Sequence, residues 1–198
     1  MSMTKNDAKA KNNSFLFCTI EDLVPMDHLV RKLESVIDWN FIYKIVEDLY
    51  STIGRRSIDP VVLFKMVFIN YVFGINSMRK TCKEIQVNLA YRWFLGLDVN
   101  DSVPNFSTYS KNYARRFAGT NVFNDIFSHV LKIAVDNNMV DTTAIFGDST
   151  HIKANANKGK HKNEVVEKSA KIYQDSLNQE IDDDRALNGK KPLKKNEK

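Results

Sequence analysis

The stretch that decides the fold is residues 59–74, DPVVLFKMVFINYVFG, in which an acid and a proline precede a long apolar run. Asp59 can accept hydrogen bonds from the free N–H groups of a first helical turn, and Pro60 has no N–H to lose there. The run is apolar on most sides, which predicts a helix over about 60–73 at the core of a helical domain. Gly74 then ends it.

Amphipathic helices are predicted on both sides of this central helix. Apolar residues at helical spacing indicate one helix from about Asp27 and a second that begins with Asp38 as its cap. On the other side, Thr120 is expected to cap a long helix over 121–137. His129 lies within that helix beside the apolar stripe, and we expect it to be packed or exposed rather than a metal ligand.

Three short helices with basic outer faces are predicted in between, over about 77–86, 88–95 and, after a Ser107 cap, 108–117. Short helices joined by tight turns predict a helix-turn-helix-like unit, and outward Lys and Arg can neutralise phosphates. The alternative is an ordinary helical bundle whose cations face water. The candidate DNA-binding residues are Arg55, Arg56, Arg79, Lys80, Lys83, Arg92, Lys111, Arg115 and Arg116.

One predicted strand follows the helices, over residues 140–148, and it ends at Asp148. A buried strand that ends in an acid can deliver a metal-binding group, although a Gly-Asp pair is also a common turn. The next segment, 154–198, offers this strand little to pair with, since it reads as a polar Lys-rich linker or tail. It contains a possible amphipathic helix near 164–187, in which the acidic run 182–184 is expected to be solvated.

These patterns divide the chain into a leader (1–20), a helical domain (21–137), the start of a second domain (138–153) and the polar tail (154–198). The 198 residues, 43% of them hydrophobic, suffice for one domain and part of another. The net charge of +5 is mild and does not by itself indicate a nucleic-acid partner. Cys18 and Cys82 form no CxxC pair, and no apolar run reaches the length of a membrane span, so we expect a soluble, reduced protein.

Three segments of the chain resemble the N-terminal part of a bacterial insertion-sequence transposase of the DDE type. The order and rough spacing of the segments match that family over most of residues 28–158. The segments are GRRSIDPVVLFK (54–65), EIQVNLAYRWFLGL (84–97) with VPNFSTYSK (103–111), and GDSTHIKANAN (147–157).

The resemblance implies an N-terminal helical domain that binds the terminal inverted repeats of the element. It also implies a ribonuclease-H-like domain in which two Asp and one Glu bind Mg²⁺ or Mn²⁺, with Asp148 as the first Asp. Phosphodiester cleavage of this kind uses two metal ions, of which one activates the attacking oxygen and the other stabilises the leaving oxygen. We would therefore expect a bacterial cytoplasmic protein, associated with the nucleoid when bound to DNA, whose protein partner is a second copy or the intact transposase.

The chain departs from the family after Asp148, because no later acid follows a strand-like run. We match none of them to the second Asp or the Glu, so the expectation is a transposase cut short, catalytically incomplete alone and without bound metal. The alternatives are a stand-alone helix-turn-helix DNA-binding regulator or inhibitor of the intact transposase, and a non-functional product with an unpaired strand. The acids after Asp148, none of which is matched to the second Asp or the Glu of the family, are Glu164, Glu167, Asp175, Glu180, Asp182, Asp183, Asp184 and Glu197.

Overall fold

The computed structural model describes residues 17–51, 57–137 and 158–192, and their regular structure is entirely helical. The elements in chain order are α2 (Ile20–Leu23), α3 (Leu29–Val36), α4 (Phe41–Val46), the 3₁₀ turn η1 (Glu47–Leu49), α5 (Pro60–Val72), α6 (Met78–Val87), α7 (Leu89–Phe94), α8 (Phe106–Asn112), the π-helical turn η2 (Tyr113–Phe117), α9 (Val122–Asp136) and α10 (Lys158–Leu187). The prediction of a mainly α protein is confirmed for this part of the chain.

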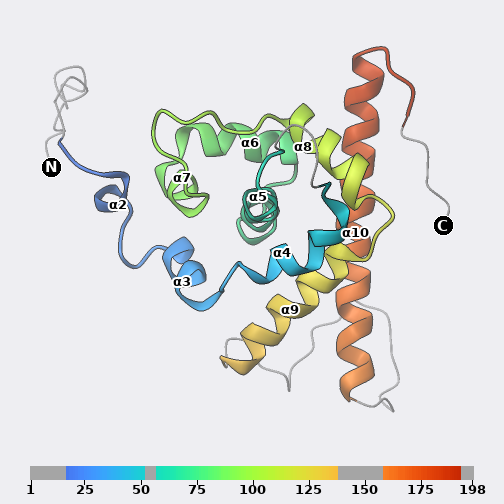
Figure 1. The fold of residues 1–198 in the computed structure, drawn as a ribbon, viewed down its shortest axis with the longest axis horizontal. Helices are drawn as coiled ribbons and strands as arrows, with labels where there is room; N and C mark the ends of the chain where they lie inside the picture. The colour runs from blue at the N-terminus through green and yellow to red at the C-terminus, as the bar shows by residue number, and fades with distance from the viewer. Residues whose placement is uncertain (1–16, 52–56, 138–157, 193–198) are drawn as a thin grey trace, which may run out of the picture.

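Helix α5 lies at the centre of the fold, where Figure 1 shows it nearly end on with other helices around it. Asp59 accepts a hydrogen bond from the Val61 N–H at 2.7 Å, and Pro60 occupies the first turn, as the sequence predicts. Every residue from Leu63 to Asn70 is buried, so the helix is enclosed on all sides over about two turns. Helices α4 and α6 pack directly against it.

The buried run of α5 includes one cation, Lys65, whose ammonium group has a partner for each of its three protons. Its Nζ lies 2.8 and 2.7 Å from the two carboxylate oxygens of Glu34 and 2.9 Å from the carbonyl oxygen of Phe94. The same nitrogen lies 5.3 Å from the ring centroid of Trp39. Because Glu34 belongs to α3 and Phe94 ends α7, the ammonium group holds both helices against α5.

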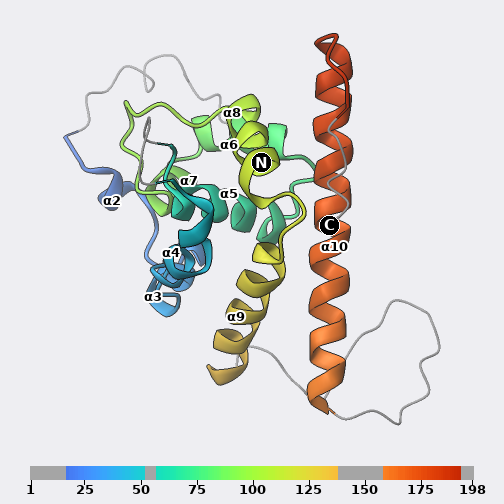
Figure 2. The same cartoon turned by 45° about the vertical axis from the view of Figure 1, so that its right-hand side comes forward.

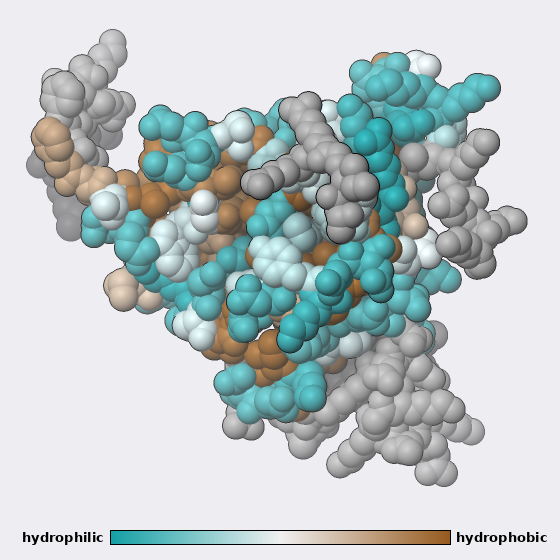
Figure 3. All heavy atoms as spheres, in the orientation of Figure 1, coloured by the Kyte–Doolittle hydropathy of each residue, from teal (hydrophilic) through white to brown (hydrophobic). Residues whose placement is uncertain are grey.

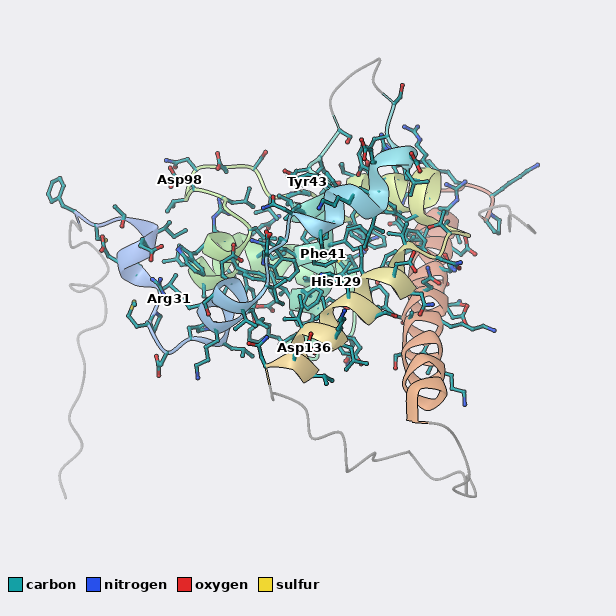
Figure 4. All side chains as sticks on the ribbon, turned by 60° about the horizontal axis from the view of Figure 1, so that its bottom comes forward. Arg31, Phe41, Tyr43, Asp98, His129 and Asp136 are labelled. Atoms are coloured by element: carbon teal, nitrogen blue, oxygen red, sulfur yellow. The ribbon has the colours of Figure 1, made fainter. Side chains whose placement is uncertain are left out.

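A second cation, Arg31 of α3, closes the N-terminal corner of the molecule (Figure 4). Its guanidinium donates to the Glu21 carboxylate at 2.5 Å and to the Val24 carbonyl at 3.0 and 3.2 Å. The guanidinium carbon also lies 4.6 Å from the ring centroid of Trp93. The hydrogen bond from Arg31 lowers the pKa of the Glu21 carboxyl. Helices α2, α3 and α7 therefore meet around one side chain.

Helix α9 runs beside α4, one residue shorter at each end than the sequence predicts. The Thr120 hydroxyl accepts from the Val122 N–H at 3.4 Å and donates to the Phe117 carbonyl at 2.8 Å. His129 is exposed, and its ring stacks on that of Phe41 with 4.0 Å between centroids, as Figure 4 shows. The expectation of a packed or exposed histidine agrees with this position.

Helix α10 shows that the predicted polar tail contains a docked helix. Figures 1 and 2 place it alongside α9, and Ala170, Leu177 and Ile181 are buried in the core. Tyr173 lies on the same face, with its ring 5.7 Å from that of Phe123. The amphipathic helix predicted near 164–187 is confirmed. Four residues at spacings of three or four are enough to dock a helix that is polar on its remaining faces.

Several predictions fall on residues that the structure does not describe. The strand over 140–148, the ribonuclease-H-like domain that it would open and Asp148 all lie outside the described residues, as do Arg55 and Arg56. The division of the chain into domains likewise stays a prediction.

The ion pair between buried Lys65 and the more exposed Glu34 predicts an asymmetric loss of stability. Glu34→Ala leaves a buried ammonium group without its counter-ion and should reduce the free energy of unfolding by about 3 kcal/mol. Lys65→Met keeps the volume and leaves a Glu34 side chain that is 37% exposed, so its loss should be smaller. Urea denaturation measures both. The exposed Lys44 provides the control, since Lys44→Met should change stability by less than about 0.5 kcal/mol. A larger loss for Lys65→Met than for Glu34→Ala would refute the prediction.

Candidate nucleic-acid interface

Helix α6 separates an apolar inner face from a basic outer face. Ser77 caps it, accepting from the Lys80 N–H at 3.2 Å, which agrees with the predicted start near residue 77. Met78, Thr81, Cys82 and Ile85 are buried. The exposed basic side chains are those of Arg79, Lys80 and Lys83. Three of the predicted DNA-binding residues are therefore accessible on one short helix.

Cys82 adds no charge to this helix. Its burial, followed by the proximity of Glu180, raises the pKa of the thiol to about 12. The thiol is therefore protonated at neutral pH, and it packs as a small apolar group beneath the basic face.

A single residue, Asn88, joins α6 to α7. Its N–H donates to the Glu84 carbonyl at 2.9 Å, and its side-chain oxygen accepts from the N–H groups of Ala90 and Tyr91 at 2.9 and 3.2 Å. One asparagine thus ends the first helix and caps the second, as predicted for the start of α7. The tight junction fits the predicted three-helix unit, while its identity as a helix-turn-helix stays a prediction.

Arg92, also predicted to contact DNA, has a structural position instead. It is 4% exposed, and its guanidinium donates to the carbonyl oxygens of Asp98, Val99 and Asp101 at distances between 2.5 and 3.2 Å. These bonds hold the turn that follows α7. Because the side chain is buried and its guanidinium donates to these carbonyl groups, Arg92 does not belong to the exposed basic surface.

Helix α8 and the turn η2 present the next basic residues. The cap is Asn105 rather than the predicted Ser107, and its side-chain oxygen accepts from the Thr108 N–H and from the Ser107 and Thr108 hydroxyls, each at 2.9 Å. Lys111 and Arg115 are exposed four residues apart, which places them near one another along the helix surface.

The remaining arginine of this segment, Arg116, is half-buried. It donates to the Asn112 side-chain oxygen at 2.5 Å, and its guanidinium carbon lies 4.6 Å from the Tyr50 ring centroid. It fastens the π-helical turn to the end of η1. Single π-helical turns recur at functional sites, and here the turn separates an exposed arginine from an anchored one.

Arg79 connects α6 to α8 and to α10. Its guanidinium carbon lies 4.7 Å from the ring centroid of Phe106, the first residue of α8. It also forms an ion pair with Asp184 of α10, although 46% of the arginine side chain remains exposed. The first turns of α6 and α8 therefore meet at this arginine, so the basic faces of both helices begin at one junction.

A metal site and a membrane-spanning helix each have requirements that the described part of the chain does not meet. No three His, Cys, Asp or Glu side chains come together there in a way that could hold a metal ion. Asp148 lies outside that part, and its role as a metal ligand stays a prediction. Among the described residues, none of the helices combines the length and the apolar character that a membrane crossing requires.

Removal of the Arg92 side chain should destabilise the protein, because three carbonyl groups lose their donor. We expect Arg92→Ala to lower the free energy of unfolding by about 2 kcal/mol, and Arg115→Ala to lower it by less than about 0.5 kcal/mol. Chemical denaturation of both variants measures the difference. Equal stability of Arg92→Ala and the unaltered protein would contradict the structural position given to Arg92.

Comparison with known proteins relates part of this chain to a described family. Residues 18–115 match the family model described as "Transposase domain (DUF772)". The matched range runs from the residues before α2 into η2 and includes all of α6, α7 and α8. No curated protein and no solved structure matches the chain. The match over residues 18–115 supports a transposase-like family for this protein.

Proposed function

We propose that this chain is the N-terminal portion of a DNA transposase and binds the terminal inverted repeats of an insertion sequence. The cations that meet DNA phosphates are those exposed on α6 and on α8 with its following turn. They are Arg79, Lys80, Lys83, Lys111 and Arg115.

The observation that carries this proposal is the overlap between the family match and the exposed cations. All five residues lie within 18–115, the range that matches a transposase domain. Binding of DNA is the function that a transposase requires of its non-catalytic part. The structure contributes the accessibility of the five side chains and the exclusion of Arg92 from the set.

Phosphate contact suits these residues on physical grounds. Lys and Arg on helix faces neutralise backbone phosphates and release counterions, which makes binding strongly dependent on salt. Such contacts position a protein on the duplex, while base edges in the grooves supply sequence specificity. The five exposed cations of α6, α8 and the turn after α8 therefore form the part of the three-helix unit that we assign to phosphate.

The catalytic half of the proposal concerns Asp148, which would be the first of the three carboxylates that hold Mg²⁺ or Mn²⁺ in an intact DDE enzyme. One carboxylate cannot hold two metal ions, so this chain alone is catalytically incomplete. A second copy or an intact transposase would be its protein partner.

A salt titration of DNA affinity tests the proposal. The probe is a 30-base-pair duplex with the end sequence of the genetic element that carries the gene, and the measurement is fluorescence anisotropy. We expect log K to fall with log salt with a slope of about −4, because about four to five phosphates are neutralised. Lys111→Ala with Arg115→Ala should weaken binding about tenfold or more and flatten the slope by about 2.

The matched control removes two exposed cations outside the proposed face. Lys190 and Lys191 lie beyond the C-terminal end of α10, and replacing both by Ala should change the affinity less than threefold, a factor worth about 0.7 kcal/mol. Equal losses for the two double variants would mean that DNA responds to net charge rather than to the α6–α8 face. A duplex of scrambled sequence separates recognition of the repeat from general phosphate contact.

A further inference from the structure

We propose that α10 is an acidic clasp, in which Glu180 and Asp184 occupy the basic start of α6 and compete with DNA for it. This inference rests on the proposed function, because it assigns a regulator to the same surface. Its basis is a set of contacts between segments that lie about a hundred residues apart in the chain.

The first contact is made by the Glu180 carboxylate at the first turn of α6. One oxygen accepts from the Ser77 hydroxyl at 2.6 Å and from the Arg79 N–H at 2.9 Å, and the other accepts from the Met78 N–H at 2.9 Å. Three donors thus surround one carboxylate. Phosphate oxygens accept from such groups in the same way, so a DNA phosphate and Glu180 cannot use them together.

The second contact is the ion pair between Asp184 and Arg79. Glu180 and Asp184 are four residues apart, which places both carboxylates on one face of α10. Only 18% of the Asp184 side chain is exposed. The prediction that this acid is solvated is therefore wrong, because Asp184 is held by its ion pair. Figure 3 shows hydrophilic side chains over the C-terminal end of α10, at the upper right of the view. The clasp thus opposes the cation at which α6 and α8 meet.

Helix α6 has a local cap in addition to the Glu180 carboxylate. The Ser77 hydroxyl oxygen already accepts from the Lys80 N–H, and Ser77 immediately precedes the helix in the chain. Glu180 adds a negative charge from a distant segment to an end that has a local cap. Its most direct consequence is to neutralise the positive end of α6 and, with Asp184, the charge of Arg79.

A solvent-open pocket of about 470 Å³ lies behind the clasp, between α10 and the turn that joins α5 to α6. Among its lining residues, Tyr71 and Ile172 remain 58% and 69% exposed. The burial that retains α10 comes from Ala170, Leu177 and Ile181 and, in part, from Tyr173.

Competition between two ligands for one surface is reciprocal. If α10 lowers the affinity of α6 for DNA, then bound DNA must weaken the attachment of α10 to α6 by the same factor. The clasp therefore has two measurable consequences, one in DNA affinity and one in the protection of α10.

The first test compares DNA affinities of the full chain with two acids neutralised. Glu180→Gln with Asp184→Asn removes both charges and retains oxygen acceptors for the α6 donors. Anisotropy with a random 30-base-pair duplex should show binding at least about fivefold tighter and a salt slope steeper by about 1, since Arg79 becomes free. Asp175→Asn with Asp183→Asn is the control, because it removes equal charge from exposed positions of the same helix.

The second test measures hydrogen exchange in α10 of the unaltered protein, so that it does not depend on any variant folding. Saturating duplex DNA should speed exchange over residues 177–187, and unchanged or slower exchange there would overturn the clasp. The clasp is also overturned if the variant with Glu180→Gln and Asp184→Asn binds DNA no more tightly than the control variant. The proposed function survives failure of the clasp in either test, provided that the unaltered protein binds DNA with a steep salt slope. Absence of DNA binding by the unaltered protein and by both variants would overturn the clasp and the proposed function together.

Discussion

The buried ammonium group of Lys65 is the interaction on which the described fold depends most. It lies in the middle of the central helix α5, and its three protons are shared between the carboxylate at the end of α3 and the carbonyl that ends α7. A buried cation is tolerated only where every donor is satisfied, so α3 and α7 must approach α5 in one arrangement. The position of α7 then fixes α6 through Asn88, because a single residue joins the two helices. The basic outer face of α6 is therefore oriented by a charge in the core.

The structure separates the positively charged side chains into those that hold the fold and those that are free to bind. Lys65 and Arg92 are buried and fully engaged with carbonyl or carboxylate oxygens, and Arg116 is anchored to its neighbours. Lys80, Lys83, Lys111 and Arg115 are exposed. Arg79 is intermediate, since its side chain is exposed in part but forms an ion pair with Asp184. The proposed DNA binding uses a surface of the second kind, and in the proposed clasp an acid pair covers one end of this surface.

Local chemistry accounts for what could be predicted from the sequence. The bounds of α5 and the starts of α6 and α7 near residues 77 and 88 follow from residues within one helical turn, and the structure confirms them. Asn105 and Ser107 are both good caps, so the start of α8 could not be decided without the packing of Phe106. The burial of Arg92 depends on a turn that folds beneath it, and the capture of Glu180 by α6 joins residues about a hundred positions apart. Tertiary contacts of this kind leave no periodic signal in the chain.

The most direct measurement of the central claim is a lysine-acetylation footprint of the full chain with and without duplex DNA. Lys80, Lys83 and Lys111 belong to α6 and α8, whereas Lys44 and Lys132 belong to α4 and α9. Figure 1 shows α6 and α8 on one side of α5 and α4 and α9 on the other. All five side chains are exposed, so each can be compared with its own reactivity in the free protein. If α6 and α8 form the DNA-binding face, DNA should protect the first three lysines and leave Lys44 and Lys132 reactive. Protection of Lys44 and Lys132 with no change at Lys80, Lys83 and Lys111 would contradict the account.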